Sequence, residues 1–322
     1  MRVRSNKERH RGIARARRRA HGHLTLLLLL VALLGACGDD GASLGPDAPG
    51  GLDAAAVVDG ASGCAVPQVA GLDGYLAGAV GHLAAAPRAS AAARTATRGY
   101  LMTELAGLGL DVSLDSYGQG ANVVGRLAAT APGASTWILI GAHFDTVAVS
   151  PGANDDATGV AAVLGVARNL AAQPCRRHGL MVVGFDQEEI GLIGSTALAG
   201  RLFAAGTALV AVHTVDQVGW DRDGDHRFEI ELPTAGLWAE YQAAAAATGS
   251  PVARTTTTAT DHASFRERGY AAAGVTEEFV GGDTTPHYHT AGDTFATVDL
   301  AYTARAVRLV SYVVGRELGA DP

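Results

Sequence analysis

The segment TWILIGAHFDT, residues 136–146, is the most informative stretch of this 322-residue chain for its fold. Its first part, 136–142, is mostly apolar and predicts a buried strand, and His143 and Asp145 follow where that strand ends. Further runs of this kind predict strands at 121–127, 180–186, 208–215 and 271–276.

The segments between these strands carry apolar residues at helical spacing. Residues 71–110 are expected to be helical, with Gly107 and Gly109 as stop signals. Further helices are expected at 157–172, 195–206, 235–247 and 300–317. Buried strands that alternate with helices predict an α/β fold, a three-layer α/β/α sandwich around a mixed, mainly parallel sheet.

The composition favours a chain with a sizeable core, because 48% of the residues are hydrophobic and 18% are charged. The net charge of −7 hides a basic head: residues 1–23 contain nine Arg and Lys residues against one acid, and the remainder carries −15. A nucleic-acid surface needs clustered positive charge, so this acidic remainder argues against nucleic acid as a partner.

The basic head precedes a short apolar run at 24–36. That run has about 13 residues, whereas a bilayer span needs roughly 20, so the order predicts a secretory signal. It ends in LGAC at 34–37, which resembles a bacterial lipobox. This resemblance implies a signal peptide at 1–36, lipidation of Cys37, and an exported cell-envelope lipoprotein that faces the periplasm or the cell surface. The alternative is an uncleaved single-helix anchor.

A tether and one large domain are expected after the signal. Residues 37–65 are rich in Gly, Ala, Asp and Pro, which predicts a flexible tether, and the domain is expected at 66–318. On this interpretation membrane contact occurs only through the lipid anchor. Cys64 and Cys175 remain, and in an oxidising compartment they either form one disulfide or stay free.

Acids and imidazoles follow three of the predicted strands. His143 and Asp145 follow the first, Glu188 and Glu189 the second, and Asp216 the third. In open α/β sheets ligands bind outside the carboxyl ends of the strands. Each group alone has a plain structural explanation as a cap or a solvated face, but three strands that deliver such groups to one edge meet the requirement of a metal site.

Six motifs in order carry a family resemblance. They are GAHFDT at 141–146, PGANDDATG at 151–159, FDQEEIGLIGS at 185–195, VDQVG at 215–219, TDHASF at 260–265 and YHTAGDT at 288–294. Together they resemble the co-catalytic zinc exopeptidases of the aminopeptidase Y and bacterial leucyl aminopeptidase type, over residues 66–318. The resemblance implies the zinc-exopeptidase (phosphorylase/hydrolase-like) fold, a zinc peptidase domain and two zinc ions.

The resemblance also implies a role for individual residues. Asp155 would bridge both ions, and the five metal ligands would be His143, Asp155, Glu189, Asp216 and His289. Glu188 would be the general base, and Tyr288 would donate a hydrogen bond to the oxyanion. Supporting positions would be Asp145, which orients His143, Asp156, which follows Asp155 across a cis peptide bond, and Asp261. His262 is expected near the site without binding metal.

The chemistry of such a site agrees with these residue types. Two dications about 3.5–4 Å apart need a shared anion, and imidazole and carboxylate are ligands suited to zinc. Another divalent ion could substitute for zinc. Since Glu188 neighbours a ligand in sequence, it would be held near the activated water while its own carboxylate stays free.

The resemblance implies an aminopeptidase that acts on peptides with a free N-terminus. The alternatives are a glutaminyl cyclase-like transferase, a carboxypeptidase of the same clan, and a binding lipoprotein without activity. Tyr288, where the cyclases typically have Trp, and Asp156 favour the peptidase. Gln217 stands where the family commonly has an apolar residue, which predicts a changed substrate preference. The sequence gives no indication of the oligomeric state.

Overall fold

The computed structural model describes residue 68 and residues 70–319. The predicted signal peptide, the lipidation site Cys37, the tether at 37–65 and Cys64 lie outside the described residues and stay predictions, as do the domain limits. Within the described part, no helix is both long enough and apolar enough to cross a membrane. Cys175 is disulfide-bonded, and its pairing with Cys64 stays a prediction.

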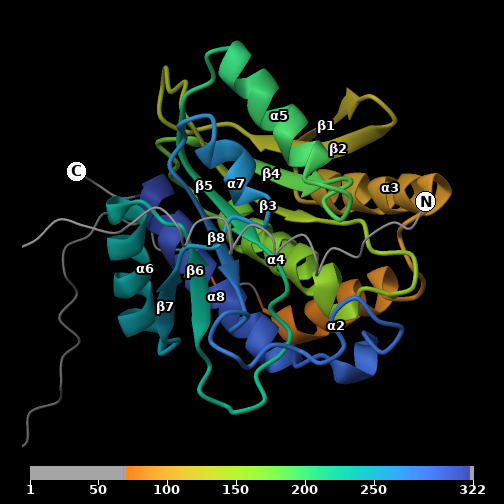
Figure 1. Cartoon of the computed structure of the whole chain (residues 1–322). Coiled ribbons are helices and arrows are strands. Elements are labelled where there is room, and N and C mark those ends of the chain that lie inside the picture. Colours follow the sequence, from red (N-terminus) through yellow and green to blue (C-terminus); the bar gives the residue numbers. More distant parts are fainter. Residues whose placement is uncertain (1–67, 69, 320–322) are drawn as a thin grey trace, which may run out of the picture. The chain divides into compact units, whose positions relative to one another are not determined.

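An eight-stranded mixed sheet forms the centre of the protein (Figure 1). Its order is β1-β2-β4-β3-β5-β8-β6-β7, and the central strands β4, β3, β5 and β8 run parallel. The strands are β1 (Asp111–Tyr117), β2 (Gly120–Leu127), β3 (Trp137–His143), β4 (Gly179–Phe185), β5 (Leu209–Val215), β6 (Phe228–Glu231), β7 (Val252–Thr255) and β8 (Ala272–Thr276).

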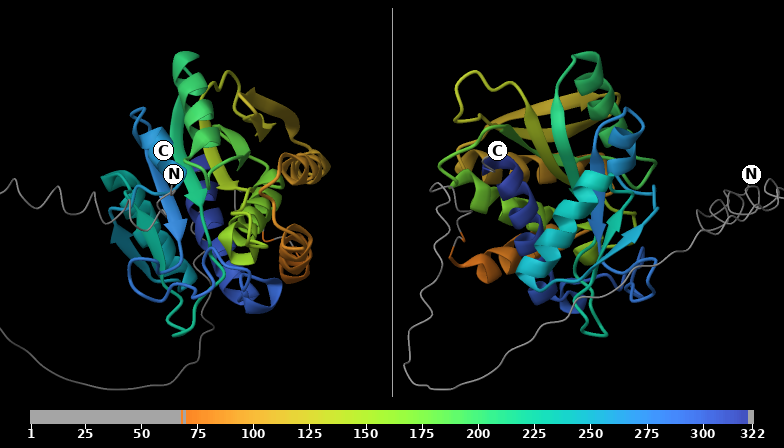
Figure 2. Two further views of the ribbon diagram at one scale, coloured as in Figure 1. Left: turned by 45° about the vertical axis from the view of Figure 1, so that its right-hand side comes forward. Right: turned by 90° about the vertical axis from the view of Figure 1, so that its left-hand side faces the viewer.

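Helices cover both faces of this sheet, which confirms the three-layer α/β/α architecture (Figure 2). One apolar core joins the sheet to α2 (Leu72–Leu83), α3 (Ala91–Gly107), α4 (Gly159–Ala171), α6 (Ala235–Thr248) and α8 (Leu300–Gly319). A second core joins the opposite face to α5 (Ile193–Ala204) and α7 (His262–Arg266). The short segments η2 (Ala153–Thr158) and η3 (Phe295–Thr297) precede α4 and α8.

The expected helix at 71–110 is two helices, α2 and α3, so this part of the prediction was wrong. The break contains Pro87, whose ring removes a backbone donor and disfavours a helix interior. Ser90 then starts α3, because its side chain accepts a hydrogen bond from the Ala93 backbone N–H at 3.1 Å.

Three strands and one helix were missed: β1, β6, β7 and α7. Strand β6 shows why, since it has only four residues and two of them are acids. Phe228 and Ile230 lie in the apolar core, whereas the alternating residues Glu229 and Glu231 are buried on the other face. The side chains of β6 therefore alternate between two faces as in any strand. The sequence did not reveal this, because the second face carries buried acids instead of exposed polar residues.

Candidate metal centre

The five predicted ligands converge at the carboxyl edge of the parallel strands. His143 is the last residue of β3, and its Nε2 lies 3.1 Å from Asp155 Oδ1 and 3.6 Å from Asp216 Oδ1. Asp216 directly follows β5, and Asp155 lies in η2 ahead of α4. These three side chains are at most 15% exposed and form one potential metal-binding group.

A second group lies on the other side of Asp155. His289 Nε2, from the loop between β8 and α8, lies 3.1 Å from Asp155 Oδ2 and 2.9 Å from Glu189 Oε2. The second oxygen of Glu189, Oε1, accepts a hydrogen bond from the backbone N–H of Val147 at 3.1 Å, which fixes the direction of the carboxylate.

Asp155 therefore presents one carboxylate oxygen to each group. Oδ1 faces His143 and Oδ2 faces His289, as a carboxylate shared between two cations would require. Each group contains one imidazole and two carboxylates, counting Asp155 in both, and such nitrogen and oxygen donors suit zinc. The residues present thus fit a pair of divalent ions.

Carboxylates outnumber imidazoles in the cluster, so its surroundings are negatively charged. Burial lowers the pKa of His289, but its contacts with Asp155 and Glu189 outweigh burial and raise it to about 10. For His143, too, burial acts downward, and the surrounding carboxylates, Glu188 first, raise the pKa above its usual value. The imidazoles lie among an excess of carboxylates, which is a setting that favours positive charge.

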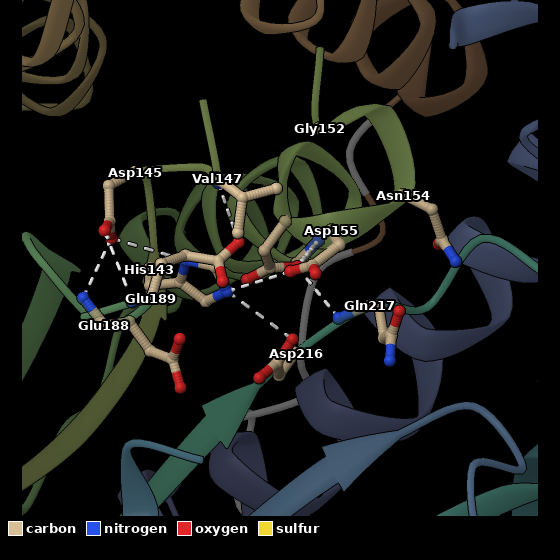
Figure 3. A network of polar contacts seen from close by, with 12 residues as sticks. His143, Asp145, Val147, Gly152, Asn154, Asp155, Glu188, Glu189, Asp216 and Gln217 are labelled. Atoms are coloured by element: carbon tan, nitrogen blue, oxygen red, sulfur yellow. Dashed lines mark hydrogen bonds and ion pairs between the residues drawn. The ribbon is translucent and has the colours of Figure 1, made fainter. Parts of the chain in front are cut away.

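Asp145 supports the segment that carries Glu188. Its Oδ1 accepts the Glu188 backbone N–H at 2.9 Å, its Oδ2 accepts that of Glu189 at 3.3 Å, and His143 Nδ1 lies 3.5 Å from Oδ1 (Figure 3). The Glu188 carboxylate points away from Asp145, and Figure 3 draws no contact to it. Burial raises the pKa of Glu188 well above its usual value.

Asp156 ties the bridging segment to β5. The Asp155–Asp156 peptide bond is cis, as expected. Asp156 is fully buried, and its Oδ1 accepts the backbone N–H groups of Gly159 at 2.8 Å and Gln217 at 2.9 Å. A Cβ at position 159 would lie 2.2 Å from that oxygen, so only glycine leaves room for the carboxylate at the start of α4.

Left-handed backbone conformations occur at or beside three of the proposed site residues. Gln187 precedes Glu188 with φ 64°, Gln217 follows Asp216 with φ 42°, and His289 itself has φ 57°. Such conformations are costly for residues with a Cβ and persist only where the surroundings enforce them. The turns after β4, β5 and β8 are thus shaped to present these side chains.

Two supporting residues were missed by the sequence analysis. Asp293 is fully buried and accepts the backbone N–H of Asn154 at 2.7 Å and of Asp155 at 3.1 Å, which links the His289 loop to the bridging segment. It lies inside the YHTAGDT motif, so a signal existed for it. Arg88 had none, because it lies between two helices outside every motif.

Arg88 ties the end of α2 to the loop between β3 and η2, the loop that leads into the segment of Asp155. It is 3% exposed, and its guanidinium donates to the carbonyl oxygens of Leu83, Phe144, Pro151 and Gly152 at 2.6–2.9 Å. Burial lowers its pKa to about 10, still well above neutrality, so the group remains a cation beneath the acidic cluster.

Replacing Arg88 by Ala is expected to lower the free energy of unfolding by at least about 3 kcal/mol, because it leaves several buried carbonyl groups unpaired. Urea unfolding measures this. The matched control is Arg316→Ala, at an arginine that is 53% exposed and 3.7 Å from Glu240, which should cost less than about 1 kcal/mol. Equal effects of the two substitutions would contradict the bracing role.

The remaining predicted residues lie around the cluster. Tyr288 stacks on the His289 ring with centroids 3.8 Å apart. Asp261 is 3% exposed and burial raises its pKa to about 7, but among the described residues it has no hydrogen bond to a proposed ligand. His213 contacts Tyr241 and Glu317 and has no contact with a proposed ligand.

A pocket of about 60 Å³ adjoins the cluster. Asp155, Glu188, Asp216 and His289 line part of it, and the aromatic rings of Phe279 and Tyr288 contribute to its wall. A substrate residue in this pocket would lie beside the proposed ligands and the proposed base.

Comparison with known proteins agrees with this geometry. The family model "Peptidase family M28" matches residues 122–314. Aminopeptidase YwaD of Bacillus subtilis is 28% identical over 187 residues, which cover 55% of this chain and 40% of that protein. The chain thus spans less than half the length of this relative.

Solved structures share the fold. LapA aminopeptidase of Legionella pneumophila matches with a TM-score of 0.71 at 19% identity, over 77% of this chain and 72% of that one. A glutaminyl cyclase of Porphyromonas gingivalis matches with a TM-score of 0.63 at 22% identity, over 76% and 96%. At these identities the likeness concerns the fold alone. The match of the family model over more than half of the chain shows that this protein belongs to peptidase family M28.

Proposed function

We propose that the protein is a metal-dependent aminopeptidase that hydrolyses the N-terminal peptide bond of peptides with the help of two zinc ions. The observation that carries this proposal is that each carboxylate oxygen of Asp155 faces a different donor group. The carboxylate of Glu188, which belongs to neither group, lines the pocket beside them. The names of YwaD and LapA, both aminopeptidases, support the reaction class.

The ligands would be His143, Asp155 and Asp216 for one ion, and Asp155, Glu189 and His289 for the other. Zinc ions bound there would lower the pKa of a water molecule and polarise the scissile carbonyl group.

The protein's own groups would then move the proton. Glu188 would accept a proton from the attacking water and deliver it to the leaving amine, since its carboxylate lines the pocket beside the proposed ligands. Asp145 fixes the Glu188 backbone for this task. Tyr288, which lines the pocket, would donate its hydroxyl hydrogen to the oxyanion.

A glutaminyl cyclase-like transferase is the second candidate, because a cyclase shares the fold over 96% of its own length. Tyr288 and the paired acids Asp155 and Asp156 favour the peptidase. A carboxypeptidase would need a free carboxylate on its substrate. Release of ammonia from glutaminyl peptides without cleavage of amino-acid p-nitroanilides would identify the cyclase.

The zinc-loaded protein is expected to cleave amino-acid p-nitroanilides that have a free amine. Activity should fall at least 100-fold after treatment with a chelator and return with zinc, because the carboxylate and imidazole cluster needs the cations to act. N-acetylated p-nitroanilides are the matched substrates and should stay uncleaved. Equal cleavage of blocked and free substrates would contradict the aminopeptidase.

The location proposed for this enzyme is the cell envelope, where the predicted lipid on Cys37 would anchor it and the segment 37–65 would hold the domain away from the membrane. Labelling with radioactive palmitate tests this. The full chain should take up label, and the Cys37→Ser variant should not.

A further inference from the structure

The pocket beside the proposed metal centre is lined by polar groups that the proposed mechanism does not use. Besides the ligands and Glu188, its lining includes Gln217, Glu231, Thr257, Thr260 and Thr276, and it contains no Lys or Arg. Most of the accessible lining is apolar and includes Ala259 and Phe279, so the pocket combines an apolar wall with a few buried polar groups. Such a combination fits a side chain with an apolar stem and a polar end, because the buried polar groups would stay unpaired against a wholly apolar partner.

Glu231 lines this pocket, but it has no hydrogen bond or ion pair with a proposed ligand among the described residues. It pairs with Gly274 of β8, which in turn pairs with Thr214 of β5, two residues before Asp216. Neighbouring strands lie about 4.8 Å apart, so the backbones of Glu231 and Asp216 are separated by about 10 Å across the sheet. Glu231 is also two residues deeper along the strands.

The position of the Glu231 carboxylate is fixed by its neighbours. A Cβ at Gly274 would lie 2.5 Å from its Oε2, so the glycine makes the room that this side chain occupies. Thr260 Oγ1 donates to Oε2 at 2.7 Å. His262 Nδ1 lies 3.4 Å from Oε2, but burial lowers the pKa of His262 to about 4, so it is a neutral neighbour.

Glu231 therefore has no cationic partner among the described residues. It is 2% exposed, and in the described part of the chain no Lys or Arg forms an ion pair with it. Burial, together with the negative charge of Asp216, raises the pKa of Glu231 to about 8, against the lowering effect of the Thr260 hydrogen bond. A cation that enters the pocket would favour ionisation of Glu231.

Gln217 provides a second acceptor. It is 5% exposed, lines the same pocket, and its Oε1 is buried without a hydrogen-bond partner among the described residues. The backbone of Gln217 is in the left-handed region, with φ 42°. The pocket thus contains two hydrogen-bond acceptors, the Glu231 carboxylate and Gln217 Oε1, that could bind a group with several donors.

We propose that this pocket receives the side chain of the substrate's first residue and selects a cationic one, above all lysine, through Glu231 and Gln217. The inference rests on the proposed aminopeptidase function. A lysine ammonium carries three donors on a four-carbon stem. At 10–15 Å³ for each water-sized group, about 60 Å³ holds roughly four to six such groups, and the lysine side chain has five non-hydrogen atoms.

The pairing of the strands indicates that Glu231 would contact the substrate's side chain rather than its α-ammonium group. The α-nitrogen is only two bonds from the scissile carbonyl carbon, which must lie next to Glu188 and the ligands. Glu231, about 10 Å across the sheet from Asp216 at the backbone, is better matched to a group at the end of a long stem.

The test compares lysine with norleucine, which keeps the four-carbon stem of lysine and lacks only the terminal ammonium group. The zinc-loaded wild type should cleave lysine p-nitroanilide with a kcat/KM at least about 10-fold above that of norleucine p-nitroanilide. The Glu231→Gln variant should lower the value for lysine by about 10- to 100-fold and change that for norleucine less than about 3-fold. The control Glu229→Gln alters a buried acid two residues earlier whose carboxylate binds the backbone of Val280 and Gly281, and it should keep the lysine preference.

A binding measurement separates this inference from the proposed function. Titration calorimetry with free lysine and free norleucine should show tighter binding of lysine to the wild type and loss of that difference in Glu231→Gln. Equal affinity for the two amino acids would overturn the inference, and so would an equal loss of both in the variant, which would assign Glu231 to the α-ammonium group. Failure of the wild type to cleave any free-amine substrate, with the lysine preference in binding intact, would instead refute the aminopeptidase and leave the cationic pocket standing.

Discussion

Replacing Glu188 by Gln is expected to lower kcat by about 10²- to 10⁴-fold while the zinc content of the protein stays the same. The substitution keeps the size of the side chain and removes only its ability to accept and release a proton. Figure 3 draws no hydrogen bond or ion pair from its carboxylate to the labelled ligands, so the substitution leaves their donor atoms in place.

The measurement combines steady-state kinetics on an amino-acid p-nitroanilide with metal analysis of the same preparation. The control is Glu278→Gln, which neutralises a mostly buried acid that pairs with Arg227 away from the centre and should leave kcat within about 3-fold. Loss of zinc from Glu188→Gln would reassign Glu188 as a ligand, and an unchanged kcat would remove it from the mechanism.

The second large effect is expected at Asp155. Its replacement by Ala should abolish binding of both zinc ions, because each donor group loses one oxygen and the two cations lose the anion between them. Activity should fall at least about 1,000-fold. Metal analysis after dialysis against a zinc buffer should find well under one ion for each chain.

Asp216→Ala is the matched comparison, because Asp216 belongs to one donor group only. This substitution should weaken binding of the ion held by His143 and Asp155. The group of Asp155, Glu189 and His289 should still bind the other ion. Asp73→Asn, at an exposed acid in the first turn of α2, should leave both ions bound. Equal zinc contents in Asp155→Ala and Asp216→Ala would argue against a bridging carboxylate.

The sequence was most informative where residue type and position along the chain coincide. The apolar runs predicted all four central parallel strands, and β3 ends at His143 as TWILIGAHFDT indicates. Polar residues directly after such runs must meet at one edge of the sheet, so the convergence of His143, Glu189 and Asp216 follows from topology. The family resemblance added Asp155 and His289, which lie outside the strand ends.

What the sequence could not show depends on contacts between distant segments. Arg88 donates to carbonyl groups at the end of α2 and in the loop between β3 and η2, and any residue type can supply a carbonyl, so no motif records the interaction. Strand β1 is an edge strand in which every residue is exposed or half-buried, and its pattern of polar side chains resembled a loop. Glu231 was hidden in the same way, because a buried acid in a four-residue strand runs against the apolar pattern by which strands are recognised.

The most direct test of the two-cation centre is an anomalous difference map from crystals of the zinc-loaded protein, recorded at the zinc absorption edge. It should contain two peaks about 3.5–4 Å apart on either side of the Asp155 carboxylate, one beside His143 and Asp216 and the other beside Glu189 and His289. A single peak, or two peaks that do not share Asp155, would contradict the account.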